Sequence, residues 1–164
     1  MIILIRPAII DDLNTITEIY NEVVLNTNFT LDTEVKPIDY QISWFKAHQD
    51  RYPLLVAEID SRIVGWCSLS PWSDRGGYED TAEISTYVHS EFRGKGVGRK
   101  LKETAINTAK TLGLHCIISR VVGENHASKL LNNKLGFRHV GTMQEVGKKF
   151  GRLHDVDVYQ LLIT

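Results

Sequence analysis

The sequence has 164 residues, of which 43% are hydrophobic and 24% are charged, and its formal net charge is -1. A chain of this size can bury a core as one domain, and its near-neutral charge argues against a disordered tail or a strongly basic nucleic-acid binder. Cys67 and Cys116 lack CxxC spacing and the histidines lack HxxxH or HxH spacing. We therefore expect two buried thiols and no metal site.

The apolar start of the chain, residues 1–5, is interrupted by Arg6 and Pro7, which leaves it too short for the core of a signal peptide. No stretch approaches the roughly 18 apolar residues that span a bilayer. The sequence thus predicts a cytoplasmic protein with no membrane and no nucleic-acid partner.

Hydrophobic periodicity and turn residues predict the elements in chain order. Strands are expected at 1–5, 54–59, 63–69, 82–89, 114–122, 137–142 and 156–163, and helices at about 13–24, 37–49, 96–112 and 125–135. Asp11 or Asp12 is expected to cap the first helix, and Asn125 the last. This order mixes hairpins with crossover helices, so it indicates an α+β (mixed α/β) fold in one domain over residues 1–164.

A glycine-rich loop, residues 93–99, stands between a predicted strand and a predicted helix. Unpaired N–H groups and the positive end of a helix attract phosphate there, although the same pattern also suits a solvated basic helix start. Two other phosphate motifs do not fit. A Rossmann loop needs a glycine where Arg99 stands, and a P-loop needs a hydroxyl residue after its lysine, where Gly96 follows Lys95.

Arg93, Gly96 and Gly98 satisfy the pattern R/Q-x-x-G-x-G/A, which resembles the pyrophosphate-binding signature of the GNAT superfamily. Residues 82–89, 125–128 and 135–137 resemble the other landmarks of that superfamily in their expected order. Segments in both halves of the chain resemble the phosphinothricin N-acetyltransferase family in particular: 29–34, 78–83, 147–151 and 154–156.

The resemblance implies the GNAT fold, a central mixed and mostly antiparallel sheet of about seven strands flanked by about four helices, with two strands splayed at an acetyl-CoA site. It implies direct transfer of acetyl from acetyl-CoA to the α-amine of a small glutamate-like amino acid such as phosphinothricin, methionine sulfoximine or methionine sulfone. It also implies a homodimer. The residues it assigns to the acetyl-CoA site are Thr86, Tyr87, Val88, Arg93, Gly94, Lys95, Gly96, Val97, Gly98, Arg99, Asn125 and Ser128.

By the same resemblance, Glu83 is the base that takes a proton from the acceptor amine, and the backbone N–H of Val88 donates to the thioester oxygen. The alternative for Glu83 is a strand carboxylate that pairs with a neighbouring basic residue. Phe29, Arg75, Tyr78 and Glu83 are assigned to the amino-acid substrate, with Arg75 suited to its carboxylate. An isolated loop arginine is also a common solvated surface residue.

Many GNAT proteins carry a tyrosine on the helix after Asn125 that protonates the departing thiolate, and relatives of the phosphinothricin type can carry histidine there. This chain has Asn132. Because asparagine cannot act as that acid, solvent and Tyr87 are the remaining candidates.

Other acceptors remain open at this stage, because sequence resemblance indicates the reaction type better than the substrate. A protein amine or a polyamine is the first alternative, and a polyamine site should be rich in carboxylates. A non-catalytic acyl-CoA sensor is the second, and it would lack a usable base.

Overall fold

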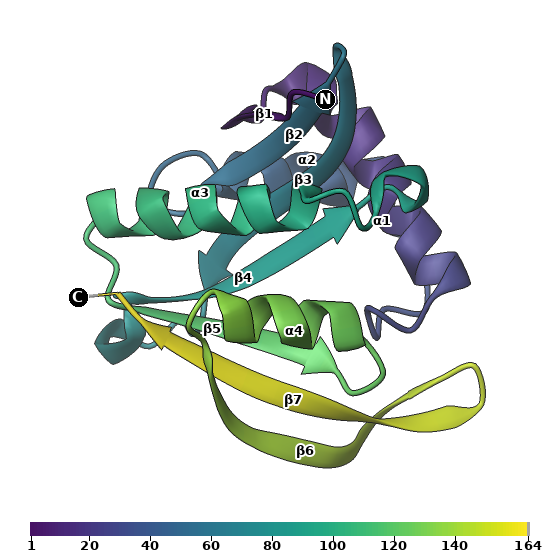
Figure 1. The fold of residues 1–164 in the computed structure, drawn as a ribbon, viewed down its shortest axis with the longest axis vertical. Coiled ribbons are helices and arrows are strands. Elements are labelled where there is room, and N and C mark those ends of the chain that lie inside the picture. Colours follow the sequence, from purple (N-terminus) through teal and green to yellow (C-terminus); the bar gives the residue numbers. More distant parts are fainter. Residues whose placement is uncertain (164) are drawn as a thin grey trace.

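The computed structural model describes residues 1–163, and within them seven strands form one mixed sheet (Figure 1). The strand order is β1-β2-β3-β4-β5-β7-β6, and every neighbouring pair is antiparallel except β4 and β5, which are parallel. The strands are β1 (Leu4–Pro7), β2 (Leu54–Ile59), β3 (Arg62–Pro71), β4 (Thr81–Val88), β5 (Cys116–Val122), β6 (Arg138–Lys149) and β7 (Arg152–Leu162).

Four α-helices cover the sheet: α1 (Leu13–Asn26), α2 (Ile38–Ala47), α3 (Val97–Thr111) and α4 (His126–Lys134). Three short 3-10 turns connect elements: η1 (Ile10–Asp12), η2 (Gly76–Tyr78) and η3 (Ser90–Phe92). The predicted fold class, with about seven strands and four helices, is therefore confirmed.

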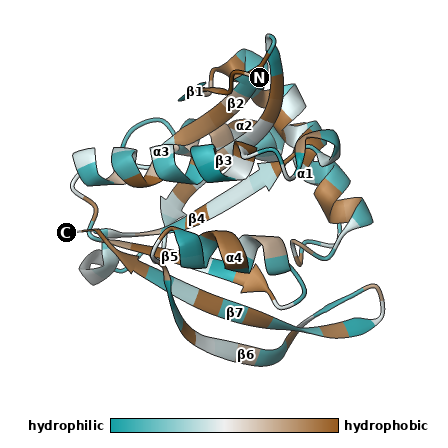
Figure 2. Ribbon diagram, in the orientation of Figure 1, coloured by the Kyte–Doolittle hydropathy of each residue, from teal (hydrophilic) through white to brown (hydrophobic). Residues whose placement is uncertain are grey.

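The sheet separates two hydrophobic cores, because successive side chains of a strand point to opposite faces. On β2, Leu55 and Ala57 join the core under α3, whereas Leu54 and Val56 join the core under α1 and α2. β2 is buried on both faces and is apolar along most of its length (Figure 2). Cys67 and Cys116 are buried free thiols, as expected.

The β6–β7 hairpin is longer than the sequence predicted (Figure 1). We expected strands at 137–142 and 156–163, whereas the pairing continues to Lys149 and Arg152. The register shifts between Met143 and Gly147, and Glu145 adopts a positive φ of 50°. This bulge breaks the alternation of polar and apolar residues that identifies a strand.

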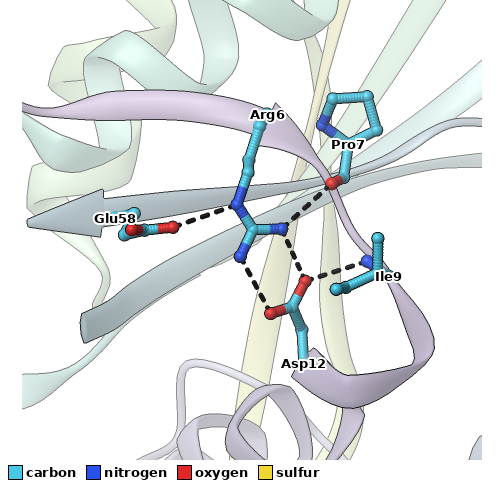
Figure 3. Close-up of polar contacts among 5 residues, drawn as sticks. All are labelled: Arg6, Pro7, Ile9, Asp12 and Glu58. Carbon is cyan, nitrogen blue, oxygen red and sulfur yellow. Dashed lines mark hydrogen bonds and ion pairs between the residues drawn. The ribbon is translucent and has the colours of Figure 1, made fainter. Parts of the chain in front are cut away.

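Asp12 precedes α1, but its carboxylate does not cap that helix as predicted. It accepts hydrogen bonds from the Ile9 N–H at 2.8 Å and from the Arg6 guanidinium at 2.8 and 3.0 Å (Figure 3). Arg6 also donates to Glu58 on β2 at 3.0 Å. One guanidinium thus joins β1, β2 and the start of α1. Burial opposes the ionised form of Asp12, but the bonds from Arg6 and Ile9 outweigh it and lower the pKa of this carboxyl.

We expect Arg6→Met to lower the free energy of unfolding by about 3 kcal/mol, because it leaves the buried Asp12 carboxylate without its charge partner. The folded protein binds the Asp12 proton more weakly than the unfolded chain does, so this contribution is present at neutral pH and is lost as the pH falls below about 4. Denaturant unfolding of both proteins between pH 3 and pH 7 measures it. A difference in stability that stays constant across this range would contradict the assignment.

Candidate active site

The parallel strands β4 and β5 separate soon after they begin (Figure 1). They pair only at Thr81, Ala82 and Glu83, opposite Cys116, Ile117 and Ile118. β4 then continues to Val88 with a partner on one side only, because its pairing with β3 extends to Val88 opposite Gly65. The second half of β4 is therefore an open strand edge in the middle of the sheet.

The backbone of Thr86 and Val88 faces this open edge. The His89 N–H donates to Val64 on β3 at 2.8 Å, and the Trp72 N–H bonds Thr81, so odd-numbered residues of β4 direct their backbone groups toward β3. Alternate residues of a strand face opposite neighbours. The N–H groups of Thr86 and Val88 consequently point toward the gap left by β5, where they are available to a ligand.

The glycine loop lies at the end of this gap and opens α3 as predicted. Gly94 and Gly96 have φ values of 75° and 86°, a left-handed conformation that favours glycine, and Gly96 is the residue before α3. The first N–H groups of α3 thus have no helical partner. An added Cβ at Gly98 would lie 3.7 Å from Val88 and 3.8 Å from Leu131, which places this turn of α3 between β4 and α4.

The charged residues of the loop have different surroundings. The Arg93 side chain folds back, donating to the Val88 carbonyl at 3.1 Å and lying 5.7 Å from the centre of the Phe29 ring. Arg99 pairs with Glu103 one turn along α3, at 2.8 Å. Lys95 lies 5.3 Å from the ring centre of Phe92. All three cations remain near the start of α3.

Asn125 is the N-cap of α4, as predicted, and its side chain accepts the Ser128 N–H at 3.3 Å. Asn125 and Ser128 therefore stabilise each other at the start of the helix. Val97 is buried against the core under α3, so it contributes to the loop only through its backbone.

Glu83 stands where β4 and β5 part, and its carboxylate forms two hydrogen bonds with the guanidinium of Arg120 on β5, one of them at 2.8 Å. These bonds raise the pKa of Arg120. The alternative considered from the sequence, a strand carboxylate paired with a basic neighbour, thus describes the contact. The Glu83 side chain still keeps 20% of its surface exposed, so it remains accessible to a proton donor.

A pocket of about 130 Å³ opens on the α1 and α2 face of the same strands. Its walls come from α1, the following loop, α2, β3 and β4: Ile16, Tyr20, Asp32, Lys36, Tyr40, Gln41, Trp44, Trp66, Ser68, Ser70, Ser85 and Tyr87. Glu83, Ser85 and Tyr87 alternate along one face of β4. Glu83 thus stands two residues before the pocket wall, on the same face of the sheet.

Aromatic rings form one side of this pocket. Trp66 lies 5.0 Å from Tyr87 and 5.3 Å from Trp44, measured between ring centres, and Tyr20 lies 5.1 Å from Tyr87. The Tyr20 hydroxyl donates to Asp32 and also bonds Thr30 at 3.0 Å. Burial raises the pKa of Tyr87 to about 12, so its phenol keeps its proton at neutral pH.

Of the four residues assigned to the substrate from the sequence, none belongs to the pocket wall. Arg75 and Tyr78 are exposed on the turn before β4, and Phe29 packs under Arg93. Asp32, Lys36 and the serines of β3 were not predicted from the sequence as pocket residues. One signal was available, because Ser68 and Ser70 put hydroxyls at alternate positions of an otherwise apolar buried strand.

Within residues 1–163, no three histidine, cysteine or acidic side chains gather as a metal site would require. No helix in the same range is both long enough and apolar enough to cross a membrane.

Comparisons with known proteins agree with this architecture. Residues 5–158 match the family model of the acetyltransferase (GNAT) domain. An L-methionine sulfoximine/L-methionine sulfone acetyltransferase of Salmonella typhimurium is 38% identical, over 96% of this chain and 92% of that protein. A phosphinothricin N-acetyltransferase of Streptomyces coelicolor is 34% identical, over 95% of this chain and 94% of that protein.

Among solved structures, a GNAT superfamily phosphinothricin acetyltransferase from Sinorhizobium meliloti in complex with acetyl-CoA superposes with a TM-score of 0.96. It is 31% identical, and the match covers 99% of this chain and 89% of that one. The splayed strands, the glycine loop at the start of α3 and these similarities show that the chain belongs to the GNAT family of acetyltransferases.

Proposed function

We propose that this acetyltransferase moves the acetyl group of acetyl-CoA to the α-amine of a small glutamate-like amino acid. The observation that carries the proposal is the open edge of β4, which leads from the glycine loop to a small pocket that contains both signs of charge. The named relatives, which acetylate methionine sulfoximine, methionine sulfone or phosphinothricin, support the same substrate class.

The residues at the open edge fit acetyl-CoA. Its pantetheine arm carries amides that can pair with the free N–H groups of Thr86 and Val88 as an added strand would. Its pyrophosphate suits the N–H groups at the start of α3, where Gly94 and Gly96 leave the backbone uncovered and Lys95 and Arg99 add positive charge. When bound, this co-substrate supplies an acetyl thioester, which an amine can attack.

Asp32 and Lys36 in the pocket wall favour an amino acid as the acceptor. A carboxylate suits an α-ammonium group, and an ammonium suits an α-carboxylate. Asp32 is the one carboxylate among the residues that line the pocket, so a polyamine, which needs several, fits less well. The volume of about 130 Å³ suits a small molecule, and the serine hydroxyls can bond a polar side chain.

Glu83 is the proposed general base, acting directly or through a water molecule. Arg120 holds its carboxylate at the parting of β4 and β5, beside the pocket. The Val88 N–H, on the open edge, is the proposed donor to the thioester oxygen as negative charge develops there. Arg75 and Tyr78 are exposed on the turn before β4, and they stay predicted contacts for the acidic end of the substrate. Phe29 stays a predicted apolar contact.

The experiment that tests the function is a thiol-release assay with acetyl-CoA and a panel of amines. We expect turnover with methionine sulfoximine, methionine sulfone and phosphinothricin, and at least tenfold lower kcat/KM with spermidine or a lysine-containing peptide. Release of CoA thiol from the polyamine or the peptide at a higher kcat/KM would contradict the proposed substrate class.

Glu83→Gln should lower kcat about 100-fold, which is the low end of what a positioned general base contributes, with little change in the KM for acetyl-CoA. Glu79→Gln is the matched control, because Glu79 is an exposed carboxylate on the turn before β4 and stands outside the pocket. If both variants turn over at the wild-type rate, Glu83 is only the ion-pair partner of Arg120.

The proposed homodimer rests on the β6–β7 hairpin. β6 is an edge strand of 12 residues, and bands of apolar residues run along β7 (Figure 2). The hairpin exposes Val140, Val146, Phe150 and Leu153, each by more than half of its surface. Exposed apolar edges of this kind favour association with another chain.

Sedimentation equilibrium should give twice the chain mass of 18.6 kDa, whereas a mass of one chain at micromolar concentration would rule this dimer out.

A further inference from the structure

Lys102 places an ammonium group in the interior of the protein. It lies on α3 with only 4% of its surface exposed, and its Nζ donates to the Asn132 side-chain oxygen on α4 at 2.7 Å. Asn132 is fully buried and donates in turn to the Ser119 hydroxyl on β5 at 3.1 Å. Lys102, Asn132 and Ser119 form what we call the Lys102 cluster.

No carboxylate within residues 1–163 forms an ion pair with this ammonium. The titratable group that acts on it is the Cys67 thiol, whose pKa burial raises to about 11, so the thiol stays neutral. The Phe137 ring centre lies 5.9 Å from Nζ. Burial lowers the pKa of Lys102 to about 8, which still leaves it mostly charged at pH 7. A buried charge without a counter-ion is costly, so this arrangement calls for an anion supplied from outside the chain.

The cluster lies where β4 and β5 part. Ser119 directly follows Ile118, the last residue of β5 that pairs with β4. Lys102 stands one helical turn after Gly98 on the same side of α3, and that side faces Val88 on β4 and Leu131 on α4. The unpaired ammonium is thus close to the open edge of β4, on the α3 and α4 face of the sheet.

We propose that the Lys102 ammonium, held by Asn132, stabilises the negative charge of the departing CoA thiolate as an ion pair. This inference rests on the proposed binding of acetyl-CoA at the open edge. Asn132 cannot donate a proton to the leaving thiolate, but it positions the lysine whose positive charge stabilises that thiolate.

The acceptor nitrogen forms a bond to the acetyl carbon, the carbon–sulfur bond breaks, and its electron pair goes to sulfur. The thiolate is held as an ion pair by the Lys102 ammonium, and solvent protonates its sulfur when CoA leaves. The proton released by the acceptor leaves separately, through Glu83.

The first test is an ultraviolet titration of the thiolate of CoA bound to the protein, which needs no acceptor amine. In the wild type, we expect the bound thiol to ionise at least one pH unit below free CoA, a tenfold larger thiolate fraction at a given low pH. In Lys102→Met this shift should disappear, because the cation is gone. With a working acceptor, kcat should fall about 100-fold or more, because the cation stabilises the developing charge, while the KM for acetyl-CoA stays nearly constant.

Two further variants keep the test decisive. Lys110→Met removes an exposed lysine from the same helix and should behave as the wild type. Asn132→Asp gives Lys102 a carboxylate partner of almost the same shape, so the bound thiol should again titrate as free CoA does. If Lys102→Met fails to fold, Asn132→Asp answers the question alone.

A bound thiol that titrates alike in the wild type, Lys102→Met and Asn132→Asp overturns the role of Lys102, whatever the melting temperatures are. Failure of the proposed function gives a different result from failure of the role of Lys102. In that case the wild type acetylates none of the amino acids, while the thiolate titration still responds to Lys102→Met.

Discussion

The parting of β4 and β5 after three paired residues is the constraint on which the rest of this structure depends. Backbone N–H groups in the middle of a sheet normally have a strand partner, and leaving them without one costs free energy unless water or a ligand bonds them. The Glu83–Arg120 pair joins the strands where they part, and the Gly98 turn of α3 lies beside Val88. The gap therefore begins at the Glu83–Arg120 pair and ends where the first turn of α3 meets Val88.

The groups proposed to act on the acceptor and on the thiol lie on opposite faces of the sheet. The pocket with Asp32 and Lys36 lies under α1 and α2, whereas the Lys102 cluster lies under α3 and α4. In the proposed reaction, the acceptor amine approaches from the first face and the thiol departs on the second. The negative charge that develops during transfer would then lie between the Val88 N–H and the Lys102 ammonium, while Glu83 takes the proton near the pocket.

Much of the fold was predictable because its signals are local. The amphipathic periodicity of α1 and α3, the Asp60–Ser61 turn, where both residues have positive φ, and the glycines before α3 each follow from a few neighbouring residues. The extension of β6 was not predictable, because the bulge at Glu145 interrupts the alternation of polar and apolar residues. The pocket was not predictable from the sequence either, because Tyr20, Asp32 and Ser85 converge only after folding. In the sequence, Lys102 looks like any surface lysine of a basic helix. Only the folded structure shows its buried contact with Asn132.

Residue-resolved amide hydrogen exchange with and without acetyl-CoA tests the role of the open edge most directly. We expect the co-substrate to slow exchange at the amides of Thr86 and Val88 and at the first turn of α3, and to leave β1 and β2 unchanged. Exchange at Thr86 and Val88 that does not change when acetyl-CoA is bound would contradict the open edge as its binding site.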